Sequence, residues 1–179
     1  MTEISDKMPT SKQTIEIKDA AIKFGLIGGL AGILISLILF FSNLQYETWA
    51  KWLQSLTMLI TIFLGVKSIA DAHKNRIIPF GILFKSGMFI TVSITLISVV
   101  YFFVYANFIE TDFVNNLLDL SRKQMAERGL SEEQIEQGIE LSKKFMSPGI
   151  MAVISTFSSL IIGAIVSLIS AAVLKKDSN

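Results

Sequence analysis

Four long stretches of this sequence are strongly apolar and almost free of charged side chains. They cover residues 24–46, 52–66, 86–109 and 150–174, and the second is extended at its end because Lys67 can snorkel. A helix needs about 20 mostly apolar residues to cross a bilayer. The pattern therefore predicts an all-α membrane protein with four transmembrane helices, at about 22–43, 50–70, 79–107 and 149–174.

The composition agrees with this prediction and excludes several classes of function. Of the 179 residues, 51% are hydrophobic and 17% are charged, so the apolar surplus is expected to face lipid, which makes the bilayer the first partner. The net charge is only +1, which gives no basic field for a nucleic acid. The absence of cysteine excludes disulfides, thiolate metal sites and cysteine nucleophiles.

Lysine and arginine gather on one side of the predicted spans. Ten of the 16 lie before the first charge-free stretch, between the second and the third, or after the fourth: Lys7, Lys12, Lys18, Lys23, Lys67, Lys74, Arg76, Lys85, Lys175 and Lys176. Cytoplasmic segments carry such an excess. Residues 1–21 also lack the apolar core of a signal peptide. We therefore interpret 1–21 as a cytoplasmic tail and 175–179 as a cytoplasmic C-terminus.

The segment 111–147, between spans three and four, has the pattern of two amphipathic helices. Their apolar faces hold Phe113, Val114, Leu117, Leu118, Leu120 and Met125, then Ile135, Ile139, Leu141, Phe145 and Met146. Gly129 suits a helix C-terminus, and Ser131 with Gln134 forms the pattern of a capping box. The sequence thus predicts an amphipathic helical hairpin, which the orientation above places outside the cytoplasm.

Small and hydroxylic residues recur along one side of the spans. They are Gly25, Gly29, Gly32 and Ser36 in span one, Gly87 and Thr91 in span three, and Ser159, Gly163 and Ser167 in span four. Such faces let helices approach closely in lipid, so we predict that these residues pack helix against helix. The alternative is a hydroxyl-lined path for a small solute. Trp49, Trp52, Lys67 and Lys85 are predicted anchors at the membrane interface.

Ionisable residues are missing from the middle of every predicted span. Proton-coupled pumps and intramembrane proteases need such residues, so both classes are disfavoured. The turn after span two carries Asp71, His73, Lys74 and Arg76, which we interpret as a solvated, positively biased loop. No metal-ligand spacing, phosphate-binding loop or catalytic signature occurs in the sequence. We therefore expect no cofactor, no metal and no enzymatic activity.

Two short segments on either side of that turn carry a family resemblance. They are Gly65-Val66-Lys67-Ser68-Ile69-Ala70-Asp71 and Pro79-Phe80-Gly81-Ile82-Leu83-Phe84-Lys85-Ser86-Gly87. In these segments and in its overall layout, the sequence resembles a bacterial family called domain of unknown function 4199. The resemblance implies a small multi-pass protein of the bacterial inner membrane. It implies no activity.

Two hypotheses of function follow from these features. The first is a non-enzymatic scaffold or accessory subunit that binds itself or another membrane protein, because the chain offers small-residue faces and an amphipathic hairpin without catalytic groups. The second is an oligomeric transporter or channel subunit for a small solute. Its path would be lined by Thr91, Thr95, Ser98, Ser155 and Ser159. An enzyme acting on lipid has the least support, because no base and nucleophile pair is evident.

Overall fold

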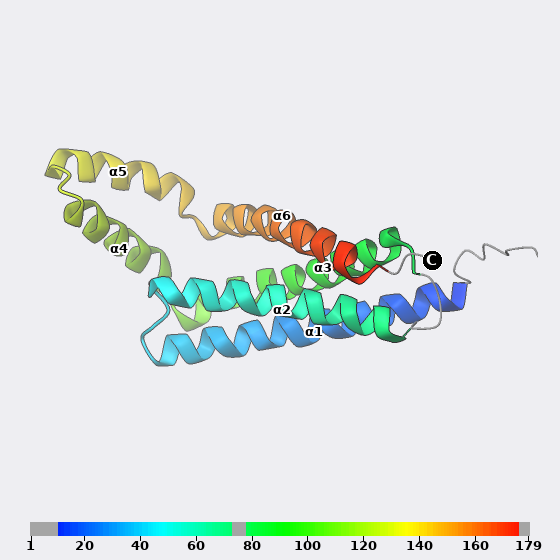
Figure 1. Cartoon of the computed structure of the whole chain (residues 1–179). Helices are drawn as coiled ribbons and strands as arrows, with labels where there is room; N and C mark the ends of the chain where they lie inside the picture. Colours follow the sequence, from blue (N-terminus) through cyan, green and yellow to red (C-terminus); the bar gives the residue numbers. More distant parts are fainter. Residues whose placement is uncertain (1–10, 73–77, 176–179) are drawn as a thin grey trace, which may run out of the picture. The chain divides into compact units, whose positions relative to one another are not determined.

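The computed structural model describes the backbone of residues 11–72 and 78–175, and side chains from Ile17 onward. Within these residues the structure is entirely helical (Figure 1). The elements are α1 (Ser11–Phe41), α2 (Thr48–Ala72), α3 (Phe80–Val104), the π-helix η1 (Tyr105–Ile109), α4 (Phe113–Glu127), α5 (Glu132–Phe145) and α6 (Pro148–Leu174). Four helices are long and apolar enough to cross a membrane: Ile17–Phe41, Thr48–Ala72, Phe80–Ile109 and Pro148–Leu174. The predicted all-α class with four apolar spans is confirmed.

The described chain divides into two compact units. The first comprises residues up to Ile97 together with those from Ser159 onward, and the second comprises Ser98–Ser158. The division falls inside α3 and inside α6, so each of these helices contributes to both units.

In the first unit, close contacts at glycines define the direction of each helix. On α1, Gly25 lies beside Ser93 of α3 and Gly29 lies beside Ile97, so α1 and α3 run parallel. Equivalent contacts make α2 antiparallel to α1 and α6 antiparallel to α3. The beginning of α1 therefore lies at the same end of this unit as the end of α6.

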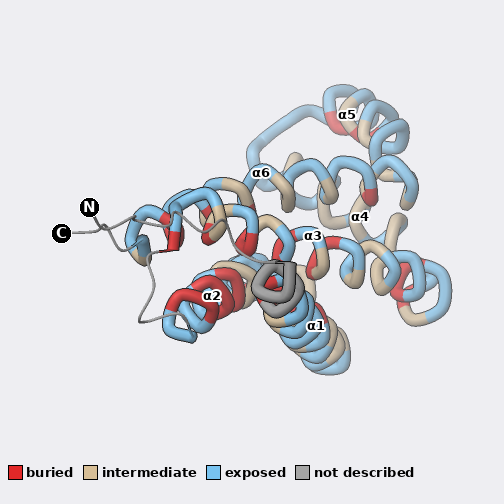
Figure 2. Tube along the Cα trace, turned by 90° about the vertical axis from the view of Figure 1, so that its right-hand side faces the viewer, coloured by how far each residue is buried: buried red, intermediate tan, exposed pale blue. Residues whose placement is uncertain are grey.

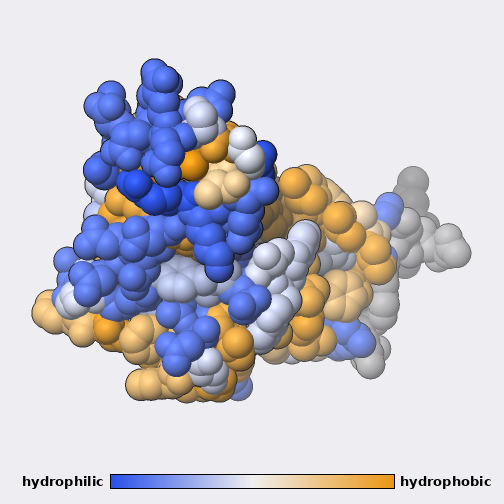
Figure 3. Space-filling model, turned by 90° about the vertical axis from the view of Figure 1, so that its left-hand side faces the viewer, coloured by the Kyte–Doolittle hydropathy of each residue, from blue (hydrophilic) through white to orange (hydrophobic). Residues whose placement is uncertain are grey.

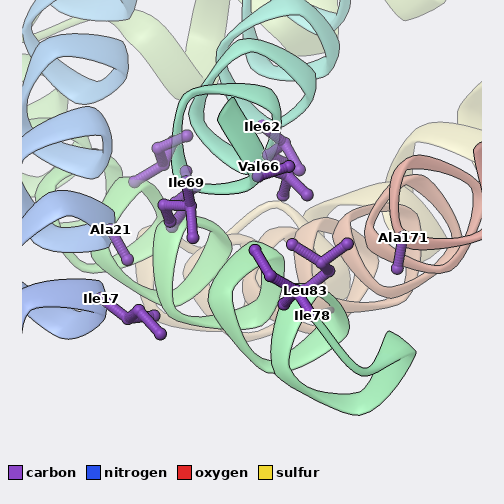
Figure 4. Close-up of a cluster of buried hydrophobic side chains, with 11 residues drawn as sticks. Ile17, Ala21, Ile62, Val66, Ile69, Ile78, Leu83 and Ala171 are labelled. Atoms are coloured by element: carbon purple, nitrogen blue, oxygen red, sulfur yellow. The ribbon is translucent and has the colours of Figure 1, made fainter. Parts of the chain in front are cut away.

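A cluster of buried aliphatic side chains fills that end of the first unit (Figure 4). Its labelled members are Ile17 and Ala21 from α1, Ile62, Val66 and Ile69 from α2, Ile78 just before α3, Leu83 from α3, and Ala171 from α6. Every long helix thus contributes to one core. Elsewhere the four long helices keep large apolar side chains exposed, as the pale blue stretches of α1 in Figure 2 illustrate, which is the arrangement that lipid contact requires.

The first helix begins earlier than the predicted span. The sequence predicts a tail over 1–21 and a span from 22, whereas α1 is already helical at Ser11. The reason is packing, because Ile17 is 9% exposed and Ala21 is fully buried in the core cluster. Residues 1–10 of the predicted tail lie outside the described part of the chain.

In the second unit, α4 and α5 pack against each other as a helical hairpin. The methyl end of Met125 on α4 fills the space above Gly138 on α5, and Arg122 pairs with Glu136 at 3.2 Å. The predicted turn chemistry is confirmed, because Gly129 has φ +77° and Ser131 with Gln134 forms a capping box. Hydrophilic side chains gather over this hairpin in Figure 3.

Candidate functional site

The predicted packing residues of spans three and four meet in the first unit. A Cβ placed on Gly87 would lie 2.5 Å from the Ser167 Oγ, and one placed on Gly163 would overlap the side chain of Thr91. The two pairs are spaced by four residues on each helix, which is the repeat that keeps residues on one helical face. We call these four residues the α3–α6 seam.

The hydroxyls of the seam bond to their own helices. Thr91 Oγ1 donates to the Gly87 carbonyl at 2.9 Å, and Ser167 Oγ donates to the Gly163 carbonyl at 2.6 Å. Both side chains are fully buried. Because each hydroxyl bonds to its own helix, the two helices are held together at the seam by packing. At each pair, a threonine or serine side chain fits against a glycine. Ser159, one turn before Gly163, is half-buried.

The glycines of α1 make the second close contact. Gly25 lies against Ser93, and a Cβ on Gly29 would lie 2.7 Å from Ile97 Cδ1. Gly28, which our sequence-based set omits, is equally close, since its Cβ would lie 2.5 Å from Thr61 Cγ2 on α2. One face of α1 therefore touches both α2 and α3.

Two members of the predicted set in span one differ from this pattern. A Cβ on Gly32 would meet no heavy atom within 4 Å among the described residues, so no helix packs against it there. Ser36, one turn further on, is half-buried. Helix α1 is nevertheless packed further along, since Leu39 is only 6% exposed. Packing at Gly32 therefore stays a prediction without a close contact behind it.

The predicted interface anchors are all exposed. Trp49 and Trp52, in the first turns of α2, are 49% and 68% exposed. Lys67 lies near the end of α2 and Lys85 near the beginning of α3, both with exposed side chains. Asp71 is exposed as well, whereas His73, Lys74 and Arg76 lie outside the described residues.

A buried carboxylate in the second unit is the feature that sequence reasoning missed. Glu110 is only 6% exposed. Its Oε2 accepts a hydrogen bond from the Tyr105 hydroxyl at 2.5 Å, and its Oε1 accepts one from Asn116 Nδ2 at 2.8 Å. We call these three residues the Glu110 joint, because they connect η1 to the second turn of α4.

The local backbone explains how this carboxylate is positioned. The π-helix η1 ends when the Glu110 N–H donates to the Tyr105 carbonyl at 2.8 Å, which places both side chains on the same side of the turn. The ring of Phe113, the first residue of α4, meets the rings of Phe102 and Tyr105 edge-on at 5.7 and 5.8 Å. Aromatic contacts therefore cover the Tyr105 side of the joint, while Asn116 is exposed. Turns of the π-helical kind are frequent at functional positions.

The role that the joint supports is to position α4. Two hydrogen bonds to one carboxylate fix the direction in which α4 leaves the end of α3, since bonds to a charged acceptor are shorter and stronger than neutral ones. Within the described residues, no group of three or more histidine, cysteine or acidic side chains could hold a metal ion. A sequence signal for the joint does exist, namely a tyrosine and a glutamate at the polar end of an apolar run, but such residues ordinarily mark only the end of a span.

These features define a multi-pass, all-helical type of membrane protein, in which four apolar helices accompany an amphipathic hairpin. The chain belongs to the family described as "Protein of unknown function (DUF4199)", whose pattern it matches over residues 23–176. The resemblance noted from the two short segments is thereby confirmed. No curated protein and no solved structure matches the chain.

Proposed function

We propose that this protein is a non-enzymatic scaffold or accessory subunit, which presents the α4–α5 hairpin outside the cytoplasm to a second membrane protein or a second copy of itself. The observation that carries the proposal is the Glu110 joint. A loose connection between two spans would need no buried carboxylate with two side-chain donors. A hairpin held in a fixed direction is suitable for recognition, because it loses little conformational entropy when it binds a partner.

The orientation rests on charge and on the order of the helices. Lys18, Lys23, Lys67, Lys85 and Lys175 belong to the end of the first unit at which α1 begins and α6 ends, and all five have exposed side chains. Under the positive-inside rule this end is cytoplasmic. Three crossings precede the hairpin, so it lies on the opposite side of the membrane, which in a bacterium is the periplasmic side of the inner membrane.

The rival hypothesis is an oligomeric transporter or channel subunit for a small solute. One observation favours it, because Thr95 is 6% exposed and its Oγ1 has no hydrogen-bond partner among the described residues. The seam counts against it, since Thr91 is fully buried between helices of a single chain and bonds to its own backbone. A pore between chains would need this side chain at the outer surface of each chain.

The test is purification of the full-length protein in mild detergent, followed by mass determination of the intact complex. Three forms are compared: the parent, a Leu117→Asp/Ile139→Asp double variant that disrupts the hairpin, and a Gln137→Asp control at an exposed position. We expect a second protein or a second copy with the parent and the control but not with the double variant. Thermal unfolding of all three forms establishes that the first unit remains folded.

Two outcomes contradict the proposal. One is a parent protein that is a monomer without any bound protein. The other is a homo-oligomer that survives disruption of the hairpin and makes vesicles permeable to small solutes, which supports the pore instead.

A further inference from the structure

The apolar side chains of α5 fall into two sets with different environments. Ile135 and Ile139 are 6% and 1% exposed and face α4. Leu141 and Phe145 are 57% and 55% exposed. Since they are four residues apart, they lie on one face of the helix. Packing of the hairpin therefore leaves a second apolar strip uncovered along the last turns of α5.

The charges of α5 are distributed unevenly around this strip. By the helical period, its nearest neighbours around the helix are Gln134, Gly138, Gln137, Ser142 and Lys144. The four glutamates of the helix, Glu132, Glu133, Glu136 and Glu140, all lie more than a quarter of a turn away from the centre of the strip. A lysine nearer to two apolar side chains than any of the glutamates is a distribution that suits an anionic lipid surface. We call Leu141, Lys144 and Phe145 the α5 edge.

The connection to the last span fixes what the α5 edge can reach. Helix α5 ends at Phe145 and the apolar helix α6 begins at Pro148. Three Cα-to-Cα steps cover at most about 11 Å. The polar headgroup region on each side of the hydrocarbon core is roughly 5–8 Å thick. When α6 crosses the membrane, the last turn of α5 is therefore held at the bilayer surface.

We propose that the α5 edge is a lipid-binding surface, with Leu141 and Phe145 inserted at the boundary of the acyl chains and Lys144 in contact with anionic phospholipid headgroups. The inference goes beyond the proposed function, because it assigns lipid as the occupant of one strip of the hairpin. It also differs from ordinary exposure of the spans to lipid, since α5 is amphipathic and too short to cross the bilayer.

The chain contains no cysteine, so a single introduced cysteine can carry a spin label without further changes. Full-length Leu141→Cys and Phe145→Cys proteins are labelled and reconstituted into vesicles of phosphatidylcholine with a minor fraction of phosphatidylglycerol. Collisions with apolar oxygen and with a water-soluble nickel complex are then measured. We expect both labels to be accessible to oxygen and shielded from nickel.

Two control positions calibrate this measurement. Glu136→Cys lies on the charged side of α5 and is expected to show the opposite pattern, with frequent nickel collisions. Phe157→Cys, at a 65% exposed position of α6, is expected to behave as a lipid-facing residue of a span. If the labels at 141 and 145 collide with nickel as often as the label at 136, the α5 edge faces water and the proposal is wrong. Labels shielded from both reagents would also overturn it, because that result means that protein covers the edge.

The headgroup contact is tested with the Leu141→Cys label in the presence of Lys144 or Lys144→Glu. We expect phosphatidylglycerol to reduce nickel collisions severalfold when Lys144 is present and to have no such effect in Lys144→Glu. If phosphatidylglycerol affected the two proteins equally, Lys144 would not contact the anionic headgroups and this part of the proposal would be wrong. Purification of the hairpin-dependent complex is a separate measurement, so a failure here is distinguishable from a failure of the proposed function.

Discussion

The side chain of Thr91 on α3 occupies the space beside Gly163 that a larger residue on α6 would need. The partner relationship at Gly87 and Ser167 is reversed, since there the glycine belongs to α3 and the larger side chain to α6. Small and larger residues thus alternate between the two helices along one seam. Lipid tails are as apolar as the helix faces, so the hydrophobic effect does not drive these helices together. Close packing of this kind then contributes to their specific association.

Adding a single methyl group to the seam should destabilise the first unit. We expect Gly163→Ala and Gly87→Ala each to cost about 1–3 kcal/mol, because the added carbon enters space that is already filled. Thermal unfolding in detergent measures the effect. The matched control is Gly32→Ala, which adds the same carbon where no other helix of the described chain has an atom within 4 Å. Equal unfolding temperatures for all three variants would show that the seam does not stabilise this unit.

Removing a donor from the Glu110 joint should loosen the start of α4. We expect Asn116→Leu and Tyr105→Phe each to weaken this region by about 1–3 kcal/mol, since the buried carboxylate then loses one of these two hydrogen bonds. Amide hydrogen exchange across residues 110–117 reports the change. Asn115→Leu serves as the control, because Asn115 is adjacent in sequence and equally exposed, whereas the bond to Glu110 comes from Asn116. The assigned role would be untenable if exchange were unaffected by either change at the joint.

The hairpin should depend on the buried face of α5. Ile139 is 1% exposed, so Ile139→Asp is expected to cost more than about 3 kcal/mol, from lost burial and from an unpaired charge. Fast hydrogen exchange throughout α4 and α5 is the expected readout. Gln137→Asp introduces the same charge at an exposed position and should leave exchange slow. If exchange were already fast in the parent protein, the hairpin would be a loose linker.

The capping box should stabilise the first turn of α5. Ser131 Oγ accepts a bond from the Gln134 N–H at 3.4 Å, and Gln134 Oε1 accepts one from the Ser131 N–H at 2.9 Å. We expect Ser131→Ala to cost about 1 kcal/mol and to accelerate exchange locally at residues 132–135. Ser121→Ala, within α4, is the control. An effect that spread equally over α4 would point to a general loss of packing rather than to a lost cap.

The two ends of the chain should lie on the opposite side of the membrane from the hairpin. Reporter domains that are active only in one compartment can be fused at residue 179 or inserted within Ser121–Gly138. We expect the C-terminal fusion to report the cytoplasm and the insertion to report the other side. The reverse pair of signals would invert the topology while leaving the order of helices unchanged.

The elements of this fold follow closely from local sequence patterns. Apolar length predicts the long helices because a membrane-spanning helix requires it, and Gly129 with Ser131 predicts the turn of the hairpin because few residues satisfy those backbone positions. The early start of α1 is different. Ile17 and Ala21 stand among charged residues, and only burial against other helices shows that they belong to the core.

The candidate site was only partly predictable for the same reason. A stripe of small residues indicates that a face packs, but not how closely a neighbouring helix approaches each position. Gly25, Gly29 and Gly32 therefore carry the same signal, although only the first two have a close neighbour. The Glu110 joint depends on a π-helical turn and on Asn116 from another helix. Neither the π-helical turn nor this contact between elements can be predicted from local sequence patterns.

The seam between α3 and α6 also has a consequence for the order of assembly during synthesis. Helices α1, α2 and α3 emerge from the ribosome consecutively and can associate at once, whereas α6 is completed only after the whole hairpin has been made. Until then the Gly87 and Thr91 face of α3 stays open to other membrane-embedded chains. A transcript truncated before Pro148 should therefore yield a product that is recognised by membrane quality control and degraded, however well its first three helices have inserted.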